Sequence, residues 1–368
     1  KLYHYNLQQG RRNSTFGCCF FVLIFFSRLS IHMQIDNHIF YTDGIVKCPP
    51  HLVTLRDICY YKTLFININR KTFIEIETIV STLLNKYTWV EQIFFDHVGD
   101  PVYNRELSAK LNTWIKSKGI RGILATSEWT KHTHSDLKEV FCINTLVSVK
   151  SYSAQELNLD SKKYRYSCLN RNPQWFRLLF YTMLKHNNKL NNNIYTFYNR
   201  DPYNDCKIDY RYYIHQIKLF ENYYKQSMEN IKDFPISWPN DIQGKNDHSI
   251  KHDAYLDAEC NIVTESAVDV EFTSEKIWKP ISSGQCFHIA GSAGTNRWLN
   301  SLGFETFDRY YDSTKNSIER LEQVVNQLDG NSMWTPENLD KISHNYHLFY
   351  SGEVENTILD PLVAIFDQ

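Results

Sequence analysis

Acidic and basic side chains lie together at two predicted element ends in the C-terminal half of the chain. Glu265 ends a predicted strand, and Glu275 and Lys276 begin a predicted helix ten residues later. A carboxylate at a strand end can accept hydrogen bonds from the hydroxyls of a ribose or a sugar. A lysine at a helix start is unusual because the dipole there disfavours cations, and an anionic ligand would explain it. The alternative is that Glu275 only caps the helix and Lys276 points to solvent.

Two arginines mark a further candidate anion site. Arg171 and Arg177 flank a turn that opens a predicted helix. Free N–H groups at a helix start suit phosphate, and arginine adds planar bidentate donors. Both arginines lie in residues 161–200, a basic stretch with eight Lys and Arg residues and no Asp or Glu. Alternatively, this stretch forms a solvated face, or it binds single-stranded nucleic acid with its aromatic rings as stacking platforms.

Composition limits the classes of protein that this chain can belong to. Its 368 residues are 42% hydrophobic and 22% charged, which excludes a disordered or collagenous chain and a multi-span membrane protein. The net charge of -1 predicts no global attraction to nucleic acid or to anionic lipid. Nine cysteines without a CxxC pair indicate a reducing compartment, with neither a disulfide framework nor a zinc knuckle.

The common nucleotide, hydrolase and metal motifs are missing from the sequence. It contains no GxxxxGK[ST] loop, no GxGxxG fingerprint, no GxSxG elbow and no HExxH helix. His132 and His134 share one predicted loop, but no partner cluster accompanies them. We therefore predict neither a bound metal nor a cofactor.

Two alternating units are predicted to position these side chains. The first has strands at 64–68, 91–96 and 120–125 and helices at 71–87 and 104–118. The second has strands at 164–169, 194–198, 260–264 and 285–290, and helices at 174–186, 213–231, 275–283, 316–328 and after Thr335. Such alternation predicts an α/β fold with parallel sheets covered by helices. Ligands of such sheets bind at the carboxyl ends of the strands, where Asp96, His97 and Glu128 lie.

The first 32 residues are expected to lie outside the fold. The apolar run at 16–26 follows two arginines and is shorter than the ~20 residues of a spanning helix. Met33 is the first methionine, so residues 1–32 either precede the natural start or form a short membrane anchor. We predict a cytoplasmic protein, with a membrane-associated N-terminus as the alternative.

The C-terminal half resembles the α1,3-fucosyltransferase-like glycosyltransferases over residues 160–305. In that family a Glu-Asn-Ser motif ends a strand and a Thr-Glu-Lys motif begins the next helix. Residues 265–267 resemble the first motif, and residues 273–276 resemble the second. Asn172, Pro173 and Arg177 resemble the family's Ser-Asn-Pro turn and its helix-borne arginine. Two departures are a serine or alanine in place of the Asn and Ser274 in place of the Thr. The elements at 279–280 and 302–307 look more like a viral or phage-type branch.

The resemblance implies two Rossmann-like domains facing across a cleft, the GT-B arrangement. Residues 33–155 would bind the acceptor, residues 156–330 would bind the donor, and residues 331–368 would form a helical segment. By resemblance, Arg177 and Lys276, with Arg171 nearby, would contact the pyrophosphate of a nucleotide sugar. Glu265 and Glu275 would position the ribose or the transferred sugar.

The activity implied is metal-independent transfer of a sugar from a nucleotide-diphosphate sugar to a glycan or another hydroxyl acceptor. Asp96, His97 or Glu128 would take the acceptor proton as general base. Nucleic acid is not expected as the main partner. We expect Lys276→Ala and Arg177→Ala each to abolish donor binding with the fold intact. The alternatives are a non-catalytic nucleic-acid-binding protein that uses the basic stretch, and a structural protein that keeps the fold without transfer.

Overall fold

The coordinates are a computed structural model of the whole chain. The residues that it describes are 30–35, 38–43, 63–68, 71–97, 105–126, 136–141, 146, 149–150, 156–170, 174–191, 193–197, 221–230, 233, 236, 253–265, 268, 273–307, 316–328 and 331–358.

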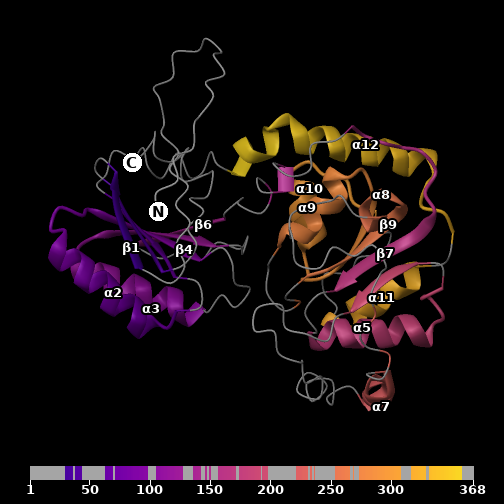
Figure 1. Ribbon diagram of the computed structural model, residues 1–368, viewed down its shortest axis with the longest axis horizontal. Helices are drawn as coiled ribbons and strands as arrows, with labels where there is room; N and C mark the ends of the chain where they lie inside the picture. The colour runs from indigo at the N-terminus through magenta and orange to yellow at the C-terminus, as the bar shows by residue number, and fades with distance from the viewer. Residues whose placement is uncertain are drawn as a thin grey trace, which may run out of the picture.

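The first half of the chain forms a six-stranded sheet in sequence order, β1-β2-β3-β4-β5-β6. Its strands are β1 (Ser30–Ile35), β2 (His38–Asp43), β3 (Thr63–Asn67), β4 (Gln92–His97), β5 (Arg121–Thr126) and β6 (Leu137–Phe141). β1 pairs antiparallel with β2, and every later pair is parallel. Helices α2 (Phe73–Lys86) and α3 (Arg105–Lys118) pack beside each other, and Figure 1 shows both along one side of this sheet.

Apolar spacing and a capping box explain helix α2. Thr72 accepts a hydrogen bond from the backbone N–H of Glu75, and the Glu75 carboxylate accepts one from the backbone N–H of Thr72. Ile76, Val80 and Leu83 are buried at helical spacing. These three residues belong to a core that also contains alternate residues of β3 and β4: Leu64, Ile66, Ile93 and Phe95.

The second half forms a four-stranded, wholly parallel sheet in the order β10-β9-β7-β8. Its strands are β7 (Tyr164–Asn170), β8 (Ile194–Phe197), β9 (Ala258–Thr264) and β10 (Cys286–Ala290). The chain moves from β7 outward to β8 and then returns to the other side of β7 as β9. This reversal makes the carboxyl ends of β7 and β9 a topological switch point, where ligands of open α/β sheets bind.

Helices cover both faces of the second sheet (Figure 1). They are α5 (Trp175–His186), α7 (Glu221–Asn230), α8 (Asp253–Leu256), α9 (Glu275–Ser282), α10 (Thr295–Ser301), α11 (Ser317–Gln327) and α12 (Pro336–Ser351). α5 packs against α7 and α11, whereas α9 packs against α12. Figure 1 places α5 and α11 on one face, and α9, α10 and α12 on the other.

An aromatic cluster holds α9 in the second core. The Trp278 ring is fully buried and lies 5.8 Å from the Trp298 ring, 5.9 Å from Phe304 and 6.4 Å from Phe349, measured between centroids. These rings come from α9, α10, α12 and the segment after α10. Burial of several large rings in one place is a major source of stability, so the start of α9 rests on a rigid base.

The predicted α/β fold class with parallel sheets is confirmed. The predicted strands and helices appear within a few residues of their expected bounds, except for the helix predicted at 213–231. α7 begins only at Glu221, and residues 213–220 lie outside the described part. β1, β2 and β6 were not predicted from the sequence, and residues 30–32, expected in the leader, belong to β1.

Several other predictions remain open in this structure. Residues 1–29 lie outside the described part, and within that part no helix is long and apolar enough to cross a membrane. The domain boundaries also remain predictions. The second core includes Leu146 and Val149, which precede the predicted donor domain, and Ile342 and Phe349 of α12, which follow it.

Gly284, which ends α9, is expected to tolerate alanine poorly. Its φ is +67°, and an added Cβ would collide with Cδ1 of Leu157. Gly284→Ala should lower the free energy of unfolding by roughly 2–3 kcal/mol, because left-handed strain adds to displacement of Leu157. Gly352→Ala is the matched control, since φ there is +89° with nothing within 4 Å, and it should cost roughly 1–2 kcal/mol. Equal losses in urea unfolding would contradict this account.

Candidate active site

Side chains from two neighbouring strands and the helices after them meet at the switch point of the second sheet. Asn170 ends β7, and Glu265 follows β9 directly. α5 follows β7 and α9 follows β9, so two helices begin at this same edge of the sheet. Arg177, on α5, and the segment from Glu265 to Lys276 therefore lie at the same edge of the sheet.

Glu265 is fully buried, and both of its carboxylate oxygens accept hydrogen bonds from Ser274. The backbone N–H of Ser274 donates to Oε1 at 3.0 Å, and its hydroxyl donates to Oε2 at 2.6 Å. Lys276 Nζ donates to the same hydroxyl oxygen at 3.0 Å and lies 3.3 Å from a Glu275 carboxylate oxygen. The Lys276 and Glu275 side chains are 23% and 22% exposed, so this hydrogen-bonded chain runs from the core to the surface.

Arg177 lies on the inner side of this cluster. Its side chain is only 3% exposed, and Nη2 donates to the carbonyl oxygens of Thr264 at 2.9 Å and Glu265 at 3.0 Å. Burial lowers the pKa of Arg177 to about 10, although the nearby Glu265 carboxylate favours the charged form. The guanidinium therefore fixes the end of β9 and offsets the buried charge of Glu265. Contact between Arg177 and a diphosphate remains a prediction.

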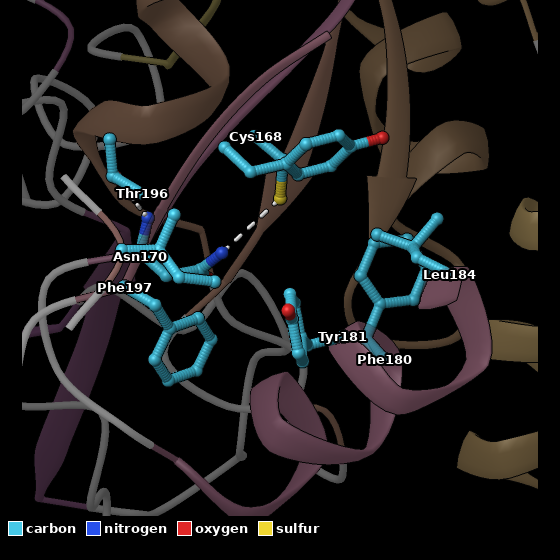
Figure 2. A pocket seen from close by; sticks show the side chains of 9 residues that line it. Cys168, Asn170, Phe180, Tyr181, Leu184, Thr196 and Phe197 are labelled. Carbon is cyan, nitrogen blue, oxygen red and sulfur yellow. Dashed lines mark hydrogen bonds between the residues drawn. The ribbon is translucent and has the colours of Figure 1, made fainter. Parts of the chain in front are cut away.

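Polar side chains also join the ends of β7, β8 and β9. The Thr264 hydroxyl donates to Oδ1 of Asn170 at 2.6 Å, and the Asn170 backbone N–H donates to the Thr196 hydroxyl at 3.2 Å. Asn170 Nδ2 donates to Sγ of Cys168 at 3.3 Å, as drawn in Figure 2. Burial raises the pKa of Cys168 to about 11, so its thiol stays protonated and unreactive at neutral pH.

A small cavity lies behind this strand-end network, between the sheet and α5. It is lined by residues that include Cys168, Asn170, Tyr181 and Thr196 (Figure 2). Its volume of ≈ 10 Å³ holds no more than about one water molecule. Ligand pockets for small molecules are usually about 300–1,000 Å³, so this cavity is not a substrate site.

The residue that follows β10, Gly291, lies against the Glu265 side chain. A Cβ at Gly291 would lie 3.3 Å from Cγ of Glu265 and 3.4 Å from its Cβ. Gly294 then takes a φ of +85° as the N-cap of α10. The chain after β10 thus passes close to the Glu265 side chain and helps to exclude water from it.

Two of the three general-base candidates, Asp96 and His97, lie at the carboxyl end of β4, where they were predicted. His97 is the last residue of β4, is buried, and pairs in register with the buried Thr126 of β5. Asp96 precedes it and pairs in register with Ala125. Glu128 lies outside the described residues, as do Arg171 and the histidines of the 132–134 loop. The acid–base roles of Asp96, His97 and Glu128 remain predictions.

Several described charges of the basic stretch are paired with acids or buried. Arg165 pairs with Glu259 at 2.7 Å, Lys185 pairs with Asp233 at 2.6 Å, and Arg177 is buried. Lys162 Nζ lies 5.3 Å from the centroid of the Trp334 ring. Arg165 is in β7, whereas Lys185 lies at the far end of α5. Two of these cations are thus paired with acids from distant parts of the chain and a third is buried, which does not favour a nucleic-acid groove.

Two polar residues of the site were not predicted from the sequence. Asn170 was assigned only to a turn, and Ser274 was read only as a departure from a family motif. A serine directly before a predicted helix is a standard N-cap signal, so its bond to the Lys276 backbone could have been expected. Its contact with Glu265 depends on the meeting of β9 and α9, which local sequence does not reveal. Among the described residues, no group of three or more His, Cys, Asp or Glu side chains could hold a metal ion.

Comparison with known proteins gives only distant likenesses. No protein-family model matches the chain, and no curated protein matches it. A UDP-forming α,α-trehalose-phosphate synthase from Burkholderia xenovorans has a TM-score of 0.47 and 9% identity, covering 92% of this chain and 90% of that chain.

Two further solved structures are similar at the same low level. A UDP-forming α,α-trehalose-phosphate synthase from Burkholderia vietnamiensis has a TM-score of 0.44 and 10% identity, covering 83% of this chain and 72% of that chain. A DNA-modifying β-glucosyltransferase has a TM-score of 0.32 and 8% identity, covering 83% of this chain and 99% of that chain. Likenesses of this size do not establish an activity for the present chain.

The contacts of Arg177 predict a structural cost for its removal. Arg177→Met should lower the free energy of unfolding by about 2–4 kcal/mol, because two buried carbonyls lose their donor and Glu265 loses a neighbouring cation. Arg165→Met is the matched control. Its side chain is 44% exposed, so loss of its pairing with Glu259 should cost no more than about 1 kcal/mol. Denaturant unfolding measures both, and a loss for Arg177→Met no larger than that of the control would contradict its role.

Proposed function

We propose that this protein is a glycosyltransferase that moves a sugar from a nucleotide-diphosphate sugar to a hydroxyl acceptor without requiring a divalent metal. The observation that carries the proposal is the chain of contacts from Arg177 through Glu265 and Ser274 to Lys276. These contacts bring two helix starts to the switch point of a parallel sheet. An ammonium group lies at the exposed end of the chain. The proposal agrees with the family resemblance of the same segments.

In the proposed reaction, the carboxyl-end edge of the second sheet stabilises the leaving nucleoside diphosphate. Negative charge develops on its phosphate oxygens as the sugar leaves, and fixed cations and helix N-termini can offset that charge. The first turn of α5 contains no acidic residue, and the side chain of its N-cap Gln174 makes no capping hydrogen bond. Backbone N–H groups of α5 and the Lys276 ammonium are therefore our candidates for diphosphate contacts, with Arg171 as a further one.

The carboxylates are proposed to recognise hydroxyl groups. Glu275 is partly exposed beside Lys276, so it can accept hydrogen bonds from ribose or sugar hydroxyls. Glu265 is buried with both oxygens bonded to Ser274, and we assign it to holding the edge together rather than to direct contact. The acceptor would bind to the first half, where Asp96, His97 or Glu128 would take its proton. The donor sugar and the acceptor are not assigned.

Removal of the Lys276 charge tests the donor site. Lys276→Met should weaken the binding of UDP or GDP by about 10–100-fold, the effect of losing a hydrogen bond to a charged group. Isothermal titration calorimetry on the full chain measures the dissociation constant. Arg177→Ala is less informative than the sequence suggested, because its burial means that the substitution also perturbs the fold.

Lys341→Met supplies the matched control for this test. Lys341 pairs with Glu337 at 3.1 Å on α12, and its side chain is 27% exposed, close to the value for Lys276. The control removes the same charge from a helix surface away from the switch point and should leave nucleotide affinity unchanged. Equal affinity of wild type and Lys276→Met, or an equal loss in both variants, would count against the assignment.

A further inference from the structure

The hydroxyl of Ser274 makes every hydrogen bond that a hydroxyl can make. Its oxygen accepts from the Lys276 backbone N–H at 3.3 Å and from Lys276 Nζ at 3.0 Å, and its proton faces Glu265 Oε2 at 2.6 Å. A serine hydroxyl has one proton to donate and two lone pairs. The backbone N–H and the ammonium are donors only, so the serine proton must go to the Glu265 carboxylate.

This arrangement links a buried anion to a surface cation in a fixed order. The Glu265 carboxylate orients the Ser274 hydroxyl, and the oriented oxygen lone pairs then receive the Lys276 ammonium. Glu265 is held in turn by Arg177, which donates to its backbone carbonyl. A lysine side chain has about four rotatable bonds and loses considerable rotamer freedom when it is held in place. A site that fixes the ammonium before a ligand arrives avoids that cost at the binding step.

An N-cap role alone does not require these contacts. Thr335, the N-cap of α12, accepts a single bond from the Asn338 backbone N–H at 3.3 Å, which equals the cap distance at Ser274. Ser274 has that cap bond and two further bonds to charged side chains. The additional bonds are the ones that lead from Glu265 to Lys276.

We propose that Ser274 is a positioning residue that holds the Lys276 ammonium, through the Glu265 carboxylate, in the place where it meets the diphosphate of the donor. This inference rests on the proposed function. It assigns Ser274 a role in ligand affinity beyond its role in starting α9.

The test compares nucleotide binding by Ser274→Ala, Ser274→Thr and Thr335→Ala, with UDP and GDP as probes in calorimetry on the full chain. Ser274→Ala should weaken binding about tenfold, Ser274→Thr should restore it because the hydroxyl is kept, and Thr335→Ala should leave it unchanged. Ser274→Gly serves if the alanine variant does not fold, since glycine is a tolerated N-cap. Wild-type affinity in both Ser274→Ala and Ser274→Gly would overturn the inference while leaving the proposed function in place.

A double-mutant cycle tests the contact without any ligand. Thermal unfolding midpoints are compared for wild type, Ser274→Ala, Lys276→Met and the double variant. We expect the shift caused by Lys276→Met to shrink in the Ser274→Ala background, and additive shifts would overturn the positioning of Lys276. If the wild type binds neither nucleotide, the proposed function fails, and the cycle still decides whether Ser274 holds Lys276.

Discussion

The buried carboxylate of Glu265 is the constraint on which the second half of the molecule depends. A charge with no exposed surface is costly unless it is hydrogen-bonded and has cations nearby. Ser274 supplies both hydrogen bonds, and Arg177 and Lys276 supply positive charge on either side. These requirements tie together the end of β9, the first turn of α5 and the start of α9. Helix α5 and the segment from β9 to α9, which are distant in sequence, are therefore held in one mutually consistent arrangement.

Polar contacts of this kind need a rigid frame, and the aromatic core provides it. Trp278 lies one turn into α9 and packs against rings from α10 and α12. Pro280, near the end of the same helix, and Gly284, just beyond it, fix how the chain leaves toward β10. Because α9 cannot shift without disturbing the core, its first residues keep their positions relative to Glu265. Preorganised polar groups of this type are what binding and transition-state stabilisation require.

Much of this frame could be predicted from the sequence, because strands and helices alternate with clear apolar spacing. The burial of Arg177 could not. One alternative for the basic stretch was a solvated face, but every residue of α5 from Phe176 to Leu184 is buried, with α7 and α11 packed against the helix. A 3.6-residue period identifies a helix, yet it does not show how many neighbours surround it. The strands β2 and β6 were missed because few apolar residues alternate in them.

The count of Lys and Arg along the sequence did not show where positive charge lies in the fold, because acids from other segments pair with some of these cations. Eight positive charges between residues 161 and 200 suggested a local positive field, since no acid lies among them. In the fold, Glu259 and Asp233 pair with Arg165 and Lys185. Nearby opposite charges cancel within a few ångströms, so a field survives only where cations remain at the surface without such cancellation. Assignment of an anion site should therefore depend on where charged tips lie in the folded molecule. Lys276 is itself paired with Glu275, and it differs from Arg165 and Lys185 in lying at the start of α9, at the switch point of the second sheet.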